Sequence, residues 1–220
     1  MIKKFENFDE FNKPMITKFK LYEAFNSAAD AWDDFIDKVN IGIIPKDPPD
    51  VKNIDKLTSI KGSGDVLDIS VGDGSNSEYF IENGYNVYGT DISPLAIKTI
   101  EEKYPQHTWI VHDTENSFPF GDNKFDIIFS RLSIHYFSQE SVSNILGDIY
   151  RILKPGGVLF IMVKITEVGN IDTGKKQHSK ESWIQLVDEQ FEIVETKSEN
   201  RKAYTFEKAP SNLLEIIAKK

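Results

Sequence analysis

The 220-residue sequence contains no cysteine. Disulfides, thiolate metal sites and mechanisms that use a cysteine nucleophile are therefore excluded. The sequence also lacks an apolar run near the ~18 residues that a membrane-spanning helix needs. Its longest apolar run, residues 156–163, has the length of a strand, and its first ten residues contain no apolar segment typical of a secretory signal. We therefore expect a cytoplasmic protein without membrane contact.

Basic side chains are scarce, since 26 Lys and Arg against 35 Asp and Glu give a formal net charge of −9. Nucleic-acid affinity depends on Lys and Arg contacts to phosphates, so this balance argues against a nucleic-acid partner. The four histidines show no spacing typical of metal ligands, and we expect no metal site. The length indicates one domain with a small appendage.

Residues 17–39 show apolar side chains at helical spacing and predict one amphipathic helix or a broken pair of helices. The apolar positions are Phe19, Tyr22, Phe25, Ala29, Trp32, Phe35, Ile36 and Val39. Asp30, Asp33, Asp34 and Asp37 share the other side, which we interpret as a solvated acidic face. Residues 41–50 form a proline-rich break, and a short helix is expected over residues 51–60.

The stretch over residues 65–77 reads as a buried strand, a tight turn with Gly72 and Gly74, and a helix start. Ser75, Asn76 and Ser77 offer side-chain oxygens that would cap this helix. Further strands are expected over residues 86–91, 108–111, 125–130, 158–163, 191–196 and 213–218. Helices are expected over residues 77–83, from Ser93-Pro94 to before Pro105, over residues 138–152, and from Ser179 through Val187.

Strands that alternate with helices at this spacing predict an α/β fold with a doubly wound, mostly parallel, seven-stranded Rossmann-like sheet. The last two strands have only a short connection and should pair antiparallel. Asp91 ends the second strand, where a carboxylate accepts ribose hydroxyls, and Asp113 follows the third, within reach of an adenine amino group. Up to this point a dinucleotide and an adenosyl-sulfonium ligand fit equally well.

Four segments together resemble the class I S-adenosylmethionine-dependent methyltransferases. Residues 68–74 look like that family's first motif, D-x-G-x-G-x-G, with Ser70 in place of the first glycine. Residues 86–91 look like its second motif, and Asp113 with residues 118–126 is similar to its D…L-P-F-x-D-x-x-F-D run. Residues 151–159 look like its R-x-L-K-P-G-G-x-L segment. The resemblance covers most of the chain from Val66 onward.

The resemblance implies S-adenosylmethionine as cofactor and a role for each matched residue. The Gly72 and Gly74 backbone would lie against the methionine part, and Asp68 would help to hold its amino group. Asp91 would bind the ribose diol, Ile92 would pack on the adenine, and Asp113 would accept from the adenine amino group. The full predicted cofactor set is Asp68, Ser70, Gly72, Gly74, Asp91, Ile92, Asp113 and Ser130.

Methyl transfer from a sulfonium is an in-line displacement that needs alignment more than a universal catalytic residue. The segment after the fourth strand therefore supplies the candidates. His135 suits general-base work near neutral pH, and His135 and Tyr136 are the candidate catalytic residues, with structural packing as the alternative. Tyr22, Trp32, Arg131 and His135 are the candidate substrate-binding residues.

The N-terminal region up to residue 60 is interpreted as a helical extension or lid, and residues 61–220 as the S-adenosylmethionine-binding methyltransferase domain. The sequence over residues 47–50, Asp-Pro-Pro-Asp, mimics a motif of the amino-methyltransferases but lies upstream of its usual place. We interpret it as a linker, and the proline-rich stretch as a hinge of the lid.

The expected function is methylation of a heteroatom on a small-molecule acceptor, by a monomer or homodimer. Residues 74–77 also resemble the G-x-N-S variant of tellurite-resistance and thiopurine-type methyltransferases, which leans toward a small acceptor. Two alternatives stay open. One is the same fold acting on a protein or nucleic acid, and the other is a module that binds S-adenosylmethionine or a dinucleotide without catalysis.

Overall fold

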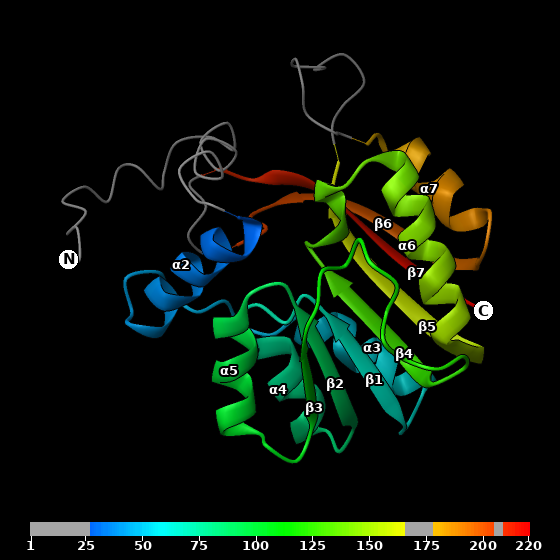
Figure 1. The fold of residues 1–220 in the computed structure, drawn as a ribbon. Helices are drawn as coiled ribbons and strands as arrows, with labels where there is room; N and C mark the ends of the chain where they lie inside the picture. The colour runs from blue at the N-terminus through cyan, green and yellow to red at the C-terminus, as the bar shows by residue number, and fades with distance from the viewer. Residues whose placement is uncertain (1–26, 166–177, 205–208) are drawn as a thin grey trace.

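A computed structural model describes residues 27–165, 178–204 and 209–220. Within these ranges a seven-stranded sheet has the order β3-β2-β1-β4-β5-β7-β6, with helices on both faces (Figure 1). The strands are β1 (Asp65–Ile69), β2 (Asn86–Asp91), β3 (Thr108–Val111), β4 (Phe125–Arg131), β5 (Leu153–Lys164), β6 (Glu192–Arg201) and β7 (Ser211–Lys219). The helices are α2 (Ala28–Asn40), α3 (Val51–Ile60), α4 (Ser75–Glu82), α5 (Pro94–Lys103), α6 (Gln139–Ile152) and α7 (Lys180–Asp188), with a 3₁₀ turn η2 (Ile134–Tyr136).

The strands β1 to β5 pair in parallel, whereas β7 lies antiparallel between β5 and β6. This arrangement confirms the predicted mostly parallel Rossmann-like sheet with antiparallel pairing at its end. Parallel pairing brings the carboxyl ends of β1, β2, β3 and β4 to one edge, where open α/β sheets bind their ligands.

The core lies in two apolar layers, one on each face of the sheet. Along β1, Val66 faces the layer that includes Ile54 of α3 and Phe80 of α4. Leu67 faces the opposite layer, which includes Ile149 of α6 and Trp183 of α7. Alternate side chains of a strand point to opposite faces, so a continuous apolar strand fills both layers. This burial fixes the positions of the strand ends.

The helix α2 begins at Ala28, where the Ser27 side chain caps it by accepting from the Asp30 amide at 3.2 Å. The described part of the predicted helix over residues 17–39 is α2, and its earlier part lies outside the described residues. Reading the carboxylates as a wholly solvated face was wrong for Asp33. Its Oδ1 accepts the Leu95 amide at 3.0 Å and the Ser93 hydroxyl, which ties α2 to the N-terminus of α5.

The start of α4 differs from the prediction. Gly74, at φ 81°, is the N-cap, and no side chain caps the helix there. Ser75 Oγ donates to the Asp47 carbonyl at 2.7 Å, and Ser77 Oγ donates to the Asp68 carboxyl at 2.6 Å. Both hydroxyls are used for tertiary contacts because they are buried on the side of α4 that faces the sheet and the preceding segment.

The expected start of the fifth strand at residue 158 was also wrong, since β5 begins at Leu153. Phe125 of β4 pairs with Leu153 and Ile127 pairs with Val158, so residues 154–157 form a bulge in the ladder. Gly156 has φ 70°, a conformation that glycine adopts without strain. The Lys-Pro-Gly-Gly sequence therefore bends the strand rather than preceding it.

The predicted helix over residues 51–60 is confirmed as α3, and it packs into the main core. Its Ile54 and Leu57 are fully buried with Val66 and Phe80. Within the proposed N-terminal extension, α3 thus shares the core of the sheet, whereas α2 lies apart beside α5 at the edge of the strand ends (Figure 1).

Candidate functional site

A cavity of about 230 Å³ opens at the carboxyl ends of β1, β2 and β4, against α2. Its lining comes from segments far apart in the chain. The lining residues are Ala28, Trp32, Phe35, Val39, Pro45, Asp47, Ser70, Val71, Gly72, Asp73, Asn76, Asp91, Ile92, Asp113, Thr114, Glu115, Arg131, Leu132, Ser133, Tyr136, Phe137 and Tyr204. The structure therefore brings most of the predicted site residues to one place.

The glycine loop and the end of β2 form one wall. Gly72 has φ 58°, and a Cβ placed on it would meet only the Ser70 carbonyl, at 3.9 Å. Its backbone therefore faces open space in the cavity. The Gly72 amide donates to Asp91 Oδ2 at 2.9 Å, and the Ser93 amide donates to Asp91 Oδ1 at 2.8 Å. Each carboxylate oxygen keeps a lone pair for a ligand hydroxyl.

Burial raises the pKa of Asp91, and the hydrogen bonds from the Ser93 and Gly72 amides oppose that rise. Asp113 lies at the far end of this wall, where its Oδ1 accepts the Glu115 amide at 3.0 Å. Ile92 directly follows Asp91 and offers an apolar, half-buried side chain to the cavity. The wall therefore combines acceptors with one apolar face.

Asp68 lies behind the cavity wall rather than on it. Its side chain is 2% exposed and accepts from Ser77 Oγ. Burial raises the pKa of Asp68 from 3.8 to about 7, the Ser77 hydrogen bond opposes that rise, and the carboxylates of Asp91 and Asp73 add to it. Asp68 is therefore about half protonated near pH 7.

Ser70 lines the cavity with an unusual backbone. Its φ is 63°, in the left-handed region that favours glycine, and its Oγ lies 2.6 Å from Ser133 Oγ. This pair of hydroxyls links the end of β1 to the segment after β4. Leu132, beside Ser133, also has a positive φ of 57°. Both strand ends are thus held in strained conformations where they meet the cavity.

Two further predicted cofactor residues, like Asp68, do not reach the lining. Gly74 packs against α5, and a Cβ on it would lie 2.7 Å from Ile100 Cδ1. Ser130 is fully buried in β4, and its Oγ has no hydrogen-bond partner among the described residues. Both residues lie next to the cavity wall and shape it from behind.

Aromatic side chains form the opposite wall. The rings of Trp32 and Tyr136 meet edge to face with centroids 6.2 Å apart, and Trp32 meets Phe35 in the same way at 5.7 Å. Tyr204, which follows β6, completes this wall with Phe137. The substrate-binding prediction for Tyr22 lies outside the described residues.

The two candidate catalytic residues occupy different places. Tyr136 lines the cavity, whereas His135 is 8% exposed and is not part of the lining. Their rings lie 4.1 Å apart. Geometry therefore puts Tyr136, rather than His135, on the cavity lining.

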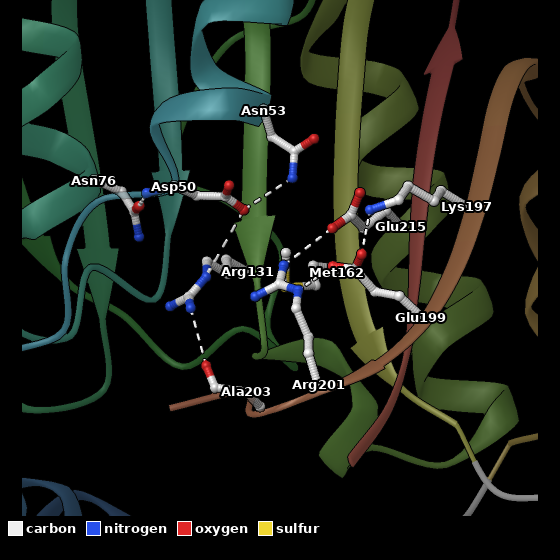
Figure 2. Close-up of polar contacts among 10 residues, drawn as sticks. All are labelled: Asp50, Asn53, Asn76, Arg131, Met162, Lys197, Glu199, Arg201, Ala203 and Glu215. Atoms are coloured by element: carbon white, nitrogen blue, oxygen red, sulfur yellow. Dashed lines mark hydrogen bonds and ion pairs between the residues drawn. The ribbon is translucent and has the colours of Figure 1, made fainter. Parts of the chain in front are cut away.

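Arg131, whose polar contacts are drawn in Figure 2, lies at the end of β4 and lines the cavity. Its Nη2 donates to the Ala203 carbonyl at 2.9 Å, and its Nε lies 3.9 Å from Asp50 Oδ2. Asp50 in turn accepts from Asn53 Nδ2 at 3.0 Å. A cationic group thus enters a cavity whose other charged lining residues are acidic.

Several lining residues had no role in the sequence-based prediction. The Asp47 amide donates to Asp73 Oδ2 at 2.9 Å, and the Asp50 amide donates to Asn76 Oδ1 at 2.9 Å. The segment interpreted as a linker is therefore bound to the glycine loop. Its Asp-Pro-Pro sequence favours an extended backbone, which was the available signal, but its hydrogen-bond partners are apparent only in the fold.

Over the described residues, no helix combines the length and the apolar composition that crossing a membrane requires. In the same ranges, no three His, Asp or Glu side chains converge as metal ligands would. A mechanism without a metal stays a prediction.

Comparisons with known proteins agree with this geometry. Residues 67–161 match the family model of a methyltransferase domain. An uncharacterized methyltransferase from Synechocystis sp. is 31% identical over 105 residues, which cover 48% of this chain and 49% of the relative. Demethylmenaquinone methyltransferase from Tropheryma whipplei is 32% identical over 112 residues, 48% of this chain and 44% of the relative. The chain spans about half the length of these curated relatives.

A solved structure extends the likeness over the whole fold. It is 1,6-didemethyltoxoflavin-N1-methyltransferase from Burkholderia thailandensis, with bound 1,6-didemethyltoxoflavin and S-adenosylhomocysteine. Its TM-score is 0.64 at 16% identity, and the match covers 100% of this chain and 93% of that chain. At this identity the likeness concerns the fold alone.

The sheet order and the cavity at its carboxyl edge define a Rossmann-like ligand-binding protein. Within that class, residues 67–161 match a methyltransferase domain, and the chain resembles the class I S-adenosylmethionine-dependent methyltransferases in sequence and in fold. The cofactor of this family is S-adenosylmethionine.

Proposed function

We propose that this protein binds S-adenosylmethionine against the glycine-loop wall of the cavity and transfers its methyl group to a heteroatom of a small-molecule acceptor. One observation carries the proposal. A single cavity joins a wall of carboxylate acceptors and exposed glycine backbone, around Gly72 and Asp91, to an aromatic wall around Trp32 and Tyr136. The first wall suits an adenosine and the second suits an organic acceptor.

The residues present fit the cofactor. Asp91 keeps acceptor capacity on both oxygens, which matches a ribose diol. Asp113 supplies an acceptor for an adenine amino group, and Ile92 supplies an apolar surface for the ring. Gly72 leaves room for a close backbone approach. When bound, the cofactor supplies an electrophilic methyl group on a sulfonium.

The chain's own contribution is alignment and exclusion of water. Trp32 and Phe35 of α2 cover the cavity opposite the glycine loop, so α2 acts as a lid over the reacting groups. Holding two reactants in line supplies much of the rate gain of a displacement. Tyr136, which lines the cavity, is the proposed residue for orienting the acceptor or receiving its proton, with the ring of His135 packed against its ring.

The cavity favours a small acceptor over a polymer, because α2 and the aromatic wall restrict it to about 230 Å³. The relative and the structural neighbour described above are named for small acceptors, demethylmenaquinone and 1,6-didemethyltoxoflavin. A protein or nucleic-acid acceptor is the first alternative. A module that binds its ligand without transfer is the second, since fold alone does not define activity.

The experiment is native mass spectrometry of the purified protein, followed by calorimetry with S-adenosylhomocysteine. Co-purified S-adenosylmethionine or its demethylated product, S-adenosylhomocysteine, supports the proposal. So does competition between these two compounds for one site. A bound dinucleotide overturns it. Release of S-adenosylhomocysteine with a panel of small hydroxylated, amino and thiol acceptors then tests transfer. Binding of the cofactor without transfer to any acceptor class favours the non-catalytic module.

A further inference from the structure

We propose that Arg131 binds an anionic group of the methyl acceptor, so that the acceptor is a small molecule with a carboxylate or a phosphate. This inference rests on the proposed function. It concerns the same cavity but adds the charge of its substrate, which neither the family match nor the relatives specify.

The charges of the lining single out Arg131. Among the described residues that line the cavity it is the sole cationic side chain. The acidic lining residues are Asp47, Asp73, Asp91, Asp113 and Glu115. Asp91 accepts two backbone amides, and Asp73 accepts those of Ser75 and Asp47. Neither Asp91 nor Asp73 forms an ion pair with Arg131, whose one ion pair among the described residues is with Asp50.

The guanidinium of Arg131 is poorly satisfied by the protein. Its side chain is 13% exposed, and its closest carboxylate oxygen is 3.9 Å from Nε. One N–H, on Nη2, donates to a carbonyl. Within the described part of the chain, the buried Nε makes no hydrogen bond. A guanidinium has five N–H donors, and buried donors in folded proteins are nearly always paired.

Arg201 provides the contrast in the same region (Figure 2). Its Nη2 lies 3.0 Å from Glu215 Oε1, and its Nε donates to Glu199. The same Nη2 also lies 3.8 Å from Met162 Sδ. Arg201 is thus paired with two carboxylates inside the protein and needs no ligand. Arg131 has one distant carboxylate, which holds the side chain in place without saturating it.

The position of Arg131 in the sheet puts it at the acceptor end. In the order β3-β2-β1-β4, the residues proposed for the adenosine lie at the ends of β2 and β3. Arg131 ends β4, on the other side of β1, and is held by Ala203 after β6. Ser133 and Tyr136, both lining residues, follow it directly. An anion on Arg131 would thus leave the rest of the acceptor beside Tyr136.

A guanidinium binds a carboxylate or phosphate through two parallel N–H···O bonds, which fixes orientation as well as charge. An acceptor held in this way would have its reacting atom oriented toward the methyl group. The competing anion for the same guanidinium is the carboxylate of the cofactor's methionine part, and the test separates the two.

The test uses matched acids and amides as probes, namely hydroxybenzoates and the corresponding hydroxybenzamides. Calorimetry measures their binding to the protein with and without S-adenosylhomocysteine. We expect an acid to bind about 10- to 100-fold more tightly than its amide, as for a charge-assisted hydrogen bond. Arg131→Gln should abolish this preference, and Arg131→Lys should restore part of it. Lys98→Gln, on the exposed side of α5, is the matched control for loss of a positive charge.

The inference is overturned if the unmodified protein binds acids and amides equally, or binds neither. This outcome does not depend on whether the variants fold. A roughly 10-fold loss of S-adenosylhomocysteine affinity in Arg131→Gln, with 5′-methylthioadenosine binding unchanged, also overturns it, because the guanidinium then serves the cofactor carboxylate. Failure of the unmodified protein to bind S-adenosylhomocysteine contradicts the proposed function alone. The acid preference measured without that ligand still tests Arg131 in that case.

Discussion

The backbone amide of Gly72 donates a 2.9 Å hydrogen bond to the carboxylate of Asp91. This bond joins the loop after β1 to the end of β2, so the two parts of the proposed cofactor wall move as one. Asp91 therefore has two roles in the proposal, to hold the glycine loop and to accept ribose hydroxyls.

Asp91→Ala is expected to weaken S-adenosylhomocysteine binding about 10- to 100-fold, because hydrogen bonds to a charged group contribute roughly 1.5–3 kcal/mol. Calorimetry measures the change. Asp122→Ala, an exposed carboxylate paired with Arg151, serves as the control and should bind as the unmodified protein does. An unchanged dissociation constant for Asp91→Ala would refute the assignment.

Asp68 predicts a pH dependence of stability. Its pKa in the folded protein is about 7 against 3.8 when unperturbed, so the folded state binds a proton that the unfolded state has lost between these values. Stability should therefore fall as the pH rises from about 4 to about 7, by at most about 4 kcal/mol. Urea unfolding across this window measures it.

Asp68→Asn keeps an acceptor for Ser77 and removes the titration, so its stability should change less over the same window. The pKa of Asp91 is also raised, but that group remains in both proteins and cancels in the comparison. Identical pH profiles for the two proteins would show that Asp68 does not titrate there.

Alanine substitutions at Gly74 and Gly84 separate two causes of lost stability, namely backbone strain and a steric clash. Both have a left-handed backbone, with φ of 81° and 83°. An alanine Cβ would meet Ile100 Cδ1 at 2.7 Å from Gly74, and nothing within 4 Å from Gly84. We expect Gly84→Ala to lose about 1–2 kcal/mol of unfolding free energy and Gly74→Ala to lose more. In a double-mutant cycle, Ile100→Val removes the clashing Cδ1. It should therefore recover only the additional stability that Gly74→Ala loses relative to Gly84→Ala.

Ser70 predicts a reversed order of two small substitutions. Ser70→Gly and Ser70→Ala both remove the hydroxyl contact to Ser133. Alanine keeps a Cβ at φ 63°, whereas glycine adopts this conformation without strain. We expect Ser70→Ala to be less stable than Ser70→Gly by about 1 kcal/mol in urea unfolding. Equal stability would mean that the left-handed backbone costs nothing at this position.

Asp33 predicts how firmly α2 is held. Asp33→Ala removes the acceptor for the Leu95 amide and the Ser93 hydroxyl at the start of α5. A contact of this kind contributes about 1 kcal/mol, so amide exchange over residues 28–40 should become roughly 5-fold faster. Asp37→Ala, on the exposed side of the same helix, is the control. Equal exchange in the two variants would place the anchor of α2 elsewhere.

Local sequence signals predicted most of the fold. The Ser93-Pro94 start of α5 depends on backbone geometry within a few residues, and it was confirmed. Apolar strands next to periodic helices specified the sheet, since only a parallel arrangement buries both faces of such strands. The bulge at Gly156 was missed because its extent depends on pairing with β4.

The site was predicted in part, because local sequence signals place only those residues that lie at the ends of strands. Asp91, Asp113 and Gly72 follow strands, so the fold class already places them at one edge. Tyr204 and Asp47 reach the cavity through contacts between distant segments, for which the sequence holds no local signal. Ser77 was expected to cap α4, but burial directs its hydroxyl to Asp68.

The carbonyl that holds Arg131 belongs to Ala203, in the C-terminal part of the chain, whereas the glycine loop belongs to the N-terminal half of the sheet. The two ends of the cavity are thus encoded in separate stretches of sequence. Under the proposed function, substitutions around β6 alter the acceptor end while the cofactor wall stays intact, which gives the chain a structural route to change its substrate without losing cofactor binding.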